Sequence, residues 1–146
     1  MPIRKLPELL LPAGGFDSAL AAFEGGADAV YLGFKDFSAR RQARNFDRLE
    51  YRRLLAHASA LGKRLYVTLN TVVTDQDYPS LVDLLGFLSA FPPAAILFQD
   101  WGLARLIKAS YPLLHLHAST QTAIQTPAGA RRAAALGVER LVLPRE

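Results

Sequence analysis

Residues 25–33, Gly25-Gly26-Ala27-Asp28-Ala29-Val30-Tyr31-Leu32-Gly33, contain the junction that decides the fold. The stretch before them has helical periodicity, with Leu20 and Phe23 three residues apart, and the two glycines end it because glycine is preferred just past a helix C-terminus. The apolar run 29–33 follows at once and is typical of a strand that is covered on both faces. A helix that ends on glycine and leads directly into a buried strand is the repeating unit of an α/β fold.

The same unit recurs along the whole chain. Strands are predicted at 9–11, 29–33, 65–69, 94–98, 113–117 and 140–143, and helices at 17–24, 47–61, 77–91, 102–109 and 126–136. Strict alternation leaves two architectures, a doubly wound sheet or a (β/α)₈ barrel. No Gly-x-Gly-x-x-Gly opens the first helix, which counts against a dinucleotide-binding sheet. We predict an α/β protein whose residues 1–146 form an incomplete (β/α)₈ TIM-like barrel of about six parallel strands and five helices.

Composition excludes several kinds of site. The 146 residues are 51% hydrophobic and include no cysteine, so the chain offers no disulfide, thiolate nucleophile or cysteine-ligated metal. No signal peptide is recognisable, and no apolar run approaches the ~18–20 residues that cross a bilayer. These features predict a cytoplasmic protein without a membrane span.

The net charge of +4 is concentrated in one stretch. Residues 35–53 contain seven Lys or Arg and three Asp or Glu, and this difference of four equals the surplus of the whole chain. Such a patch attracts phosphate or carboxylate groups, as a nucleic-acid-binding segment would. The alternative is a solvated helix face next to a loop.

Polar side chains follow each predicted strand, at the rim where (β/α) barrels carry their active sites. They are Arg40, Arg41 and Asn45 after the second strand, Asn70 and Thr71 after the third, Gln99 and Asp100 after the fourth, Ser119, Thr120 and Gln121 after the fifth, and Arg145 and Glu146 after the sixth. Each can instead be an ordinary cap or turn residue, because Asp100 and Ser119 both precede a helical stretch.

Metal and protease sites are poorly supported by the residues themselves. His115 and His117 are two apart on a predicted strand and so share a face, but no third ligand has a fixed approach, and two satisfied imidazoles explain the pattern equally well. No Gly-x-Ser-x-Gly or His-Glu-x-x-His is present, and no acid is placed to orient His117 toward Ser119. We predict no metal site and no competent peptidase site.

Several segments resemble the peptidase U32 family, the collagenase-like proteases, in order along the whole chain. They are residues 7–14 (PELLLPAG), 26–33 (GADAVYLG), 37–40 (FSAR), 45–46 (NF), 66–71 (YVTLNT), 118–121 (ASTQ) and 141–146 (LVLPRE). The loop around Arg41, Gln42 and Arg44 departs from the mix of small residues and arginine expected there.

This resemblance implies an activity for a longer protein. Family members act in hydroxylation of tRNA or rRNA bases, with prephenate implicated, or in oxygen-independent hydroxylation of quinone precursors, and they carry an iron–sulfur cluster on cysteines beyond the matched region. The chain would then be the N-terminal part of such a barrel, without a cofactor of its own, and we expect it to be inactive alone. The alternatives are a true U32 peptidase and a nucleic-acid-binding fragment without chemistry.

The resemblance also implies roles for individual residues. Arg40 and Arg145 would hold an anionic ligand, with Asn45, Ser119 and Thr120 also in the substrate site. Asn70 and Gln121 would orient a base or ring, and Glu146 would handle a proton, so Asn70 and Glu146 are the expected catalytic pair. Because an incomplete barrel leaves two strand edges open, we also expect self-association edge to edge.

Overall fold

The computed structural model describes residues 6–39 and 44–145. The elements, in chain order, are β1 (Leu10–Pro12), α1 (Phe16–Glu24), β2 (Ala29–Gly33), α2 (Arg48–Ala60), β3 (Arg64–Leu69), η1 (Asp75–Asp77), α3 (Tyr78–Ala90), β4 (Ala95–Phe98), α4 (Trp101–Ser110), β5 (Leu116–Ala118), η2 (Thr120–Thr122), α5 (Pro127–Ala135) and β6 (Val138–Leu141).

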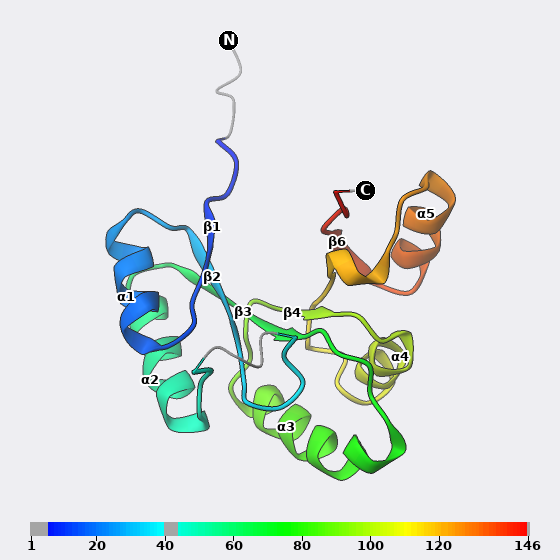
Figure 1. Cartoon of the computed structure of the whole chain (residues 1–146), viewed down its shortest axis with the longest axis horizontal. Helices are drawn as coiled ribbons and strands as arrows, with labels where there is room; N and C mark the ends of the chain where they lie inside the picture. Colours follow the sequence, from blue (N-terminus) through cyan, green and yellow to red (C-terminus); the bar gives the residue numbers. More distant parts are fainter. Residues whose placement is uncertain (1–5, 40–43, 146) are drawn as a thin grey trace.

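The six strands form one parallel sheet in the order β1-β2-β3-β4-β5-β6. The sheet curves so that the helices cover its outer side, while its inner side opens toward the gap between β1 and β6 (Figure 1). This arrangement confirms the predicted α/β fold, an incomplete barrel of six parallel strands and five α-helices. Parallel neighbours place the carboxyl ends of all the strands at one rim, where the predicted polar residues follow them.

Local sequence signals set most of the element boundaries. The Asp47 carboxylate accepts a hydrogen bond from the Glu50 amide at 2.8 Å, and the Glu50 carboxylate accepts one from the Asp47 amide at 3.3 Å, which forms a capping box at the start of α2. Thr126 likewise caps α5 by accepting from the Gly129 amide at 3.1 Å. Gly62, just past α2, has a φ of 65°, a conformation that glycine adopts without steric cost.

The last two strands lie two to three residues away from their predicted positions. The predicted start of the fifth strand at Leu113 is wrong, because a turn closed by the Leu114 amide and the Tyr111 carbonyl occupies that segment and leaves Leu113 82% exposed. The sixth strand begins at Val138 instead of Arg140, directly after Gly137. A register shift between Leu116 and His117 accompanies this difference.

The main core lies between the sheet and its helices. Strand side chains of one parity, such as Val30, Val67 and Ile96, pack here against helix residues such as Leu54 and Leu85, all of them essentially inaccessible to solvent. Complete burial of each large aliphatic side chain contributes about 1.5–3 kcal/mol. This outer layer therefore supplies most of the stability of the fold.

The concave face of the sheet carries a polar network that joins the two ends of the chain. Glu8 lies just before β1 and accepts hydrogen bonds from the Tyr66 hydroxyl at 2.7 Å and from Arg140 of β6 at 2.5 Å, and it also pairs with Arg64 at 3.0 Å. Burial alone would raise the pKa of Glu8, but the hydrogen bonds from Tyr66 and Arg140 and the charges of Arg140 and Arg64 hold it below the ordinary value. The pKa of Tyr66 is raised, by burial and by its bond to Glu8.

His117 of β5 borders this network on the concave face. Its ring lies 5.1 Å from the Tyr66 ring and is 7% exposed. Burial, together with the positive charge of Arg140, lowers its pKa to about 4, so the imidazole is neutral at pH 7. The neighbouring His115 is largely exposed and bonds to Glu139 at 2.6 Å. In the part of the chain described, no three His, Cys, Asp or Glu side chains are grouped as metal ligands.

Arginines of the basic stretch pack on aromatic rings as well as facing solvent. The guanidinium groups of Arg48, Arg52 and Arg53 lie 5.0, 4.4 and 5.0 Å from the centroids of Phe87, Phe91 and Phe16. Arg48 also pairs with Asp83, and Arg44 with Glu50. This part of the stretch thus serves as a helix face that covers its neighbours. None of the described helices is long and apolar enough to span a membrane.

Candidate functional site

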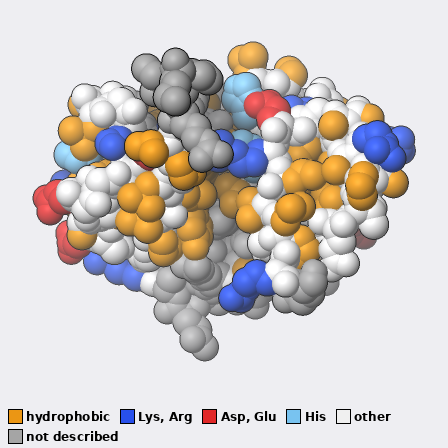
Figure 2. Space-filling view, turned by 90° about the horizontal axis from the view of Figure 1, so that it is seen from above, with side chains coloured by type: hydrophobic (Ala, Val, Ile, Leu, Met, Phe, Trp, Pro, Cys, Tyr) orange, Lys and Arg blue, Asp and Glu red, His pale blue; other side chains and the backbone are white. Residues whose placement is uncertain are grey.

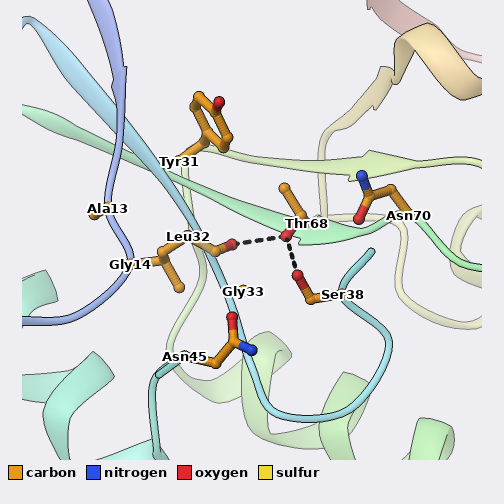
Figure 3. A pocket seen from close by; sticks show the side chains of 9 residues that line it. All are labelled: Ala13, Gly14, Tyr31, Leu32, Gly33, Ser38, Asn45, Thr68 and Asn70. Carbon is orange, nitrogen blue, oxygen red and sulfur yellow. Dashed lines mark hydrogen bonds between the residues drawn. The ribbon is translucent and has the colours of Figure 1, made fainter. Parts of the chain in front are cut away.

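A small pocket with both polar and apolar lining lies at the carboxyl ends of β1, β2 and β3 (Figure 3). Its volume is about 40 Å³, and its lining residues are Ala13, Gly14, Tyr31, Leu32, Gly33, Ser38, Asn45, Thr68 and Asn70. Three loops and three strand ends thus converge on one point of the rim. Asn45 and Asn70, two of the predicted site residues, both line it.

The floor of the pocket depends on a glycine at the end of β2. A Cβ atom at Gly33 would lie 2.3 Å from Ser38 Oγ, closer than real Cβ atoms approach a neighbour, and 3.0 Å from Thr68 Oγ1, which is a tight contact. Thr68 donates a hydrogen bond to the Leu32 carbonyl at 3.0 Å, and its Oγ1 lies 3.4 Å from Ser38 Oγ. The absence of a side chain at Gly33 thus brings two buried hydroxyls together beneath the opening.

Asn45 is held against the pocket by its backbone. It has a φ of 54°, in the left-handed region that asparagine tolerates better than most residues. The backbone amide of Asn45 donates a hydrogen bond to the Gly14 carbonyl at 3.1 Å, and the backbone amide of Phe46 donates one to the Gly33 carbonyl at 2.9 Å. This turn ties the β2–α2 loop to β1 and β2 and leaves the Asn45 side chain buried, 5% exposed, beside Gly33 (Figure 3).

Asn70 lies on the opposite side of the opening, one residue past β3. Its Oδ1 atom accepts a hydrogen bond from the Ala39 amide at 3.1 Å, so it fixes the start of the same β2–α2 loop. The side chain is only partly buried, and an amide group offers both donors and acceptors. Asn45 and Asn70 therefore frame the pocket with amide groups, while Ser38 and Thr68 supply hydroxyls.

The other predicted site residues do not line this pocket. Ser119 is buried at the start of η2, where its Oγ accepts from the Gln121 amide at 3.5 Å, and Thr120 and Gln121 are exposed in that turn. Arg145 is exposed near the C-terminal end. Arg40 and Glu146 lie outside the described residues. Asp100, considered as a rim residue, caps α4 by accepting from the Leu103 amide at 2.9 Å.

Sequence reasoning had not assigned Ser38, Thr68 and Gly33 to the site. Thr68 carried a detectable signal, because a hydroxyl in the middle of the apolar run 65–69 needs a partner once it is buried. Ser38 had none, since a serine in a polar loop is ordinary. Ser38 belongs to the site because the fold brings it close to Thr68, 30 residues away in the sequence, beside Gly33.

The chemistry of the pocket is that of neutral hydrogen bonding. Among the residues that the structure describes, its lining contains no histidine, lysine, arginine or carboxylate, so these residues present neither a general base nor a counter-ion. Because the sequence contains no cysteine, this chain supplies no thiolate ligands for an iron–sulfur cluster, and its residues do not fit that group. The described side chains of the pocket offer hydroxyl and amide groups, which donate and accept hydrogen bonds without carrying a charge.

Comparison with known proteins places this geometry in a family. Residues 14–146 match the sequence profile of peptidase family U32. Over 140 residues the chain is 31% identical to the tRNA hydroxylation protein P of Haemophilus influenzae, with 96% of this chain and 30% of that protein covered. It is 36% identical over 139 residues to a 23S rRNA 5-hydroxycytidine synthase of Escherichia coli, with 95% and 21% covered.

Other relatives have peptidase names. The chain is 30% identical over 115 residues to a protein of Porphyromonas gingivalis named collagenase, with 78% of this chain and 27% of that protein covered. A solved structure of a U32 peptidase has the same fold, with a TM-score of 0.75 and 15% identity over 98% of this chain and 60% of that one. The chain thus spans about a fifth to a third of the length of these curated relatives.

Proposed function

The chain belongs to peptidase family U32, and we propose that it forms the substrate-recognising part of an enzyme that hydroxylates bases of tRNA or rRNA in the cytoplasm. The single observation that carries the proposal is the pocket framed by Asn45 and Asn70, whose described lining carries no charge. Amide side chains read a nucleobase through paired donors and acceptors. Relatives named for tRNA and rRNA hydroxylation support the same reading.

The size of the pocket specifies how a base would be placed. A volume of about 40 Å³ exceeds the ~10–15 Å³ that one water molecule requires, but it is smaller than a whole nucleobase. We therefore place only the polar edge of an unpaired base between the two asparagines. The redox step of the hydroxylation would use groups that this chain does not supply. Prephenate or a quinone precursor would take part in that step.

Peptide hydrolysis has less support in the described residues. A serine nucleophile needs a base within hydrogen-bond reach, and Ser38 contacts Thr68. His117, the buried histidine, contacts the Tyr66 ring on the concave face and does not line the pocket.

RNA binding by the chain itself is the first test. We expect a fluorescein-labelled single-stranded RNA of twelve nucleotides to bind, as measured by anisotropy at low salt. Asn70→Ala should weaken that binding by about fivefold, the equivalent of one neutral hydrogen bond. The matched control is Gln76→Ala, which removes an exposed amide side chain of η1 outside this pocket. Equal affinities of the two variants, or cleavage of gelatin by the purified chain, would contradict the proposal.

A chimera tests catalysis. This chain, placed in the matching segment of the Escherichia coli tRNA hydroxylation protein P, should restore hydroxylated tRNA nucleosides to a strain that lacks that protein. Asn70→Ala in the chimera should abolish the product, while Gln76→Ala should retain it, at equal chimera abundance by immunoblot. Retained hydroxylation in the Asn70→Ala chimera excludes the assigned role.

We also propose that the open edges of the sheet pair with another chain. In the part of the chain described, β1 and β6 each have one strand neighbour, and Leu9 and Leu143 near them are 45% and 64% exposed. Hydrophobic side chains lie on both halves of the face that contains the gap (Figure 2). Sedimentation at several concentrations should show a dimer or larger species, and a monomer at all concentrations excludes this pairing.

A further inference from the structure

A second and larger pocket lies between α4 and α5, and it shares no residue with the pocket framed by Asn45 and Asn70. Its volume is about 520 Å³, within the range of about 300–1,000 Å³ typical of small-molecule sites. Trp101 and Arg105, one helical turn apart on α4, line one side. Gly129 and Arg132, on one face of α5, line the other side together with Leu136, which directly follows that helix.

The two arginines lack the counter-ions that surface arginines usually find. Arg105 and Arg132 form no ion pair with a carboxylate among residues 6–39 and 44–145. None of the ten residues that line the pocket is acidic, and the first turn of α5 contains no Asp or Glu. Two guanidinium groups on facing helices therefore give this pocket a positive charge that the described residues do not neutralise.

Apolar groups make up most of the remaining lining, which includes the Trp101 ring, while Thr122, Gln125 and Thr126 add polar groups. The ring of Trp101 packs edge-on against Phe98, with their centroids 5.2 Å apart, which fixes its orientation. Ile124 is 9% exposed and packs close to Gly129, where a Cβ atom would lie 3.2 Å from its Cγ2 atom. The small residue at 129 thus keeps the space open. A fixed aromatic wall in an apolar pocket favours a ligand with a planar ring.

From these observations we propose that the pocket between α4 and α5 binds a small organic anion that carries a planar ring. The ring would pack against Trp101 and Ile124, and the carboxylate or phosphate would accept hydrogen bonds from Arg105 and Arg132, as guanidinium groups favour. A mononucleotide and an aromatic carboxylic acid both have this chemistry. The inference is independent of the proposed RNA-base site, because the two pockets share no residue.

The chain provides its own reporter for this test. Trp101 is its single tryptophan, so intrinsic fluorescence reports directly on the wall of this pocket. The full chain is titrated with AMP and with phenylacetate, and binding is measured in parallel by calorimetry. Adenosine, benzyl alcohol, acetate and inorganic phosphate each present only the ring or only the anion and serve as comparison ligands.

We expect AMP or phenylacetate to bind saturably and to change the Trp101 fluorescence, and the four comparison ligands to bind at least about tenfold more weakly. Arg105→Gln and Arg132→Gln should each raise Kd at least about tenfold, since each removes a charged hydrogen bond. Arg131→Gln is the matched control, because this exposed arginine is adjacent on α5 but does not line the pocket.

The pattern of binding identifies the ligand class. Binding of AMP alone assigns the site to nucleotides, and binding of phenylacetate alone assigns it to aromatic acids. The proposal is overturned if neither compound binds by either method, or if both arginine variants bind as tightly as the parent chain. Circular dichroism of the variants shows that loss of binding is not loss of fold.

Discussion

The two faces of the sheet are held in different ways. The outer face packs aliphatic strand residues such as Val67 and Ile96 against five helices, and its stability comes from burial. The concave face has a small apolar cluster around Ala95 and Leu97, next to hydrogen-bonded and charged groups centred on Glu8 and Tyr66. The stability that the outer face contributes should therefore depend on the volume of the packed side chains. The stability that the concave face contributes should depend on pH and on the presence of each hydrogen-bonding partner.

This difference explains how a sheet with open edges keeps its curvature. The outer contacts join elements that are neighbours in sequence, as in any β/α repeat. The bond between Arg140 and Glu8 joins residues 132 apart and spans the concave face from β6 to the segment before β1. Aliphatic burial is non-directional, whereas a hydrogen-bonded carboxylate fixes the positions of the groups around it.

The largest effect should come from the outer face. Leu85 of α3 is fully buried, so Leu85→Ala should lower the free energy of unfolding by about 3 kcal/mol through lost burial and a residual cavity. The loss should be the same at pH 5 and pH 7 in urea titrations, because no titrating group is removed. Leu113→Ala, at an 82% exposed leucine, should change stability by less than about 0.5 kcal/mol. A pH-dependent loss at Leu85 would contradict the assignment.

A second large effect should follow from filling space at the carboxyl end of β2. Gly33→Ala should cost about 2 kcal/mol, because its Cβ would lie 2.3 Å from Ser38 Oγ. Gly86→Ala on α3 is the matched control, since a Cβ there meets nothing within 4 Å and alanine favours a helix by up to about 1 kcal/mol. Thermal unfolding should thus shift in opposite directions for the two variants. An unchanged unfolding temperature of Gly33→Ala would mean that the loop containing Ser38 moves away from the added methyl group at little cost.

The histidine on the concave face should make stability depend on pH. Its pKa is about 4 when folded and about 6.5 when unfolded, so the unfolded state binds the proton first as the pH falls. His117 should therefore reduce stability by about 2 kcal/mol between pH 7 and pH 5, with further loss down to about pH 4. His117→Gln should lose correspondingly less stability over that interval in urea titrations. An identical pH dependence in variant and parent would show that the imidazole is solvated.

A smaller effect is expected from the carboxylate that joins the ends. Glu8→Gln should cost about 1–2 kcal/mol at pH 7, because it weakens the bonds to Arg140 and Tyr66 at a partly exposed site. The folded pKa of Glu8 is lowered, so its contribution is present above the unfolded value of about 4.5 and is lost as the pH falls through the folded value. Parent and variant should converge at low pH. Glu24→Gln, at an exposed carboxylate of α1, should show almost no difference at either pH.

The smallest effect concerns arginines on the outer surface. Arg52 lies 4.4 Å from the centre of the Phe91 ring, and Arg52→Gln should cost about 0.5–1 kcal/mol. Arg131→Gln, an arginine for which the described residues provide no ring contact, should be close to neutral. Chemical denaturation of both variants measures the difference. Equal free energies of unfolding for the two variants would mean that the contact between the Arg52 guanidinium and the Phe91 ring does not stabilise the fold.

Much of this architecture was predictable because its signals are local. The glycines after α1 and α2, the Asp47–Glu50 capping box and the Thr126–Pro127 start of α5 each act within a few residues. The error at β5 comes from a turn between Tyr111 and Leu114 that an apolar run does not reveal. The error at β6 accompanies a register shift, which depends on the pairing of β5 with β6. Asn45 and Asn70 were predictable as rim residues because they follow strands. The contact between Ser38 and Thr68 was not predictable, because it brings together residues that are 30 apart in the sequence.

The sequence by itself determined the alternation of strands and helices, the parallel sheet and the family, because periodicity, caps and motifs are properties of contiguous residues. Only the tertiary structure decided that Glu8 meets Arg140, that Asn45 and Asn70 frame one pocket, and that Arg105 and Arg132 both line another. These contacts depend on the curvature of the sheet and on the spacing of its helices. Both arise from the packing of all the elements together, so no short segment encodes them.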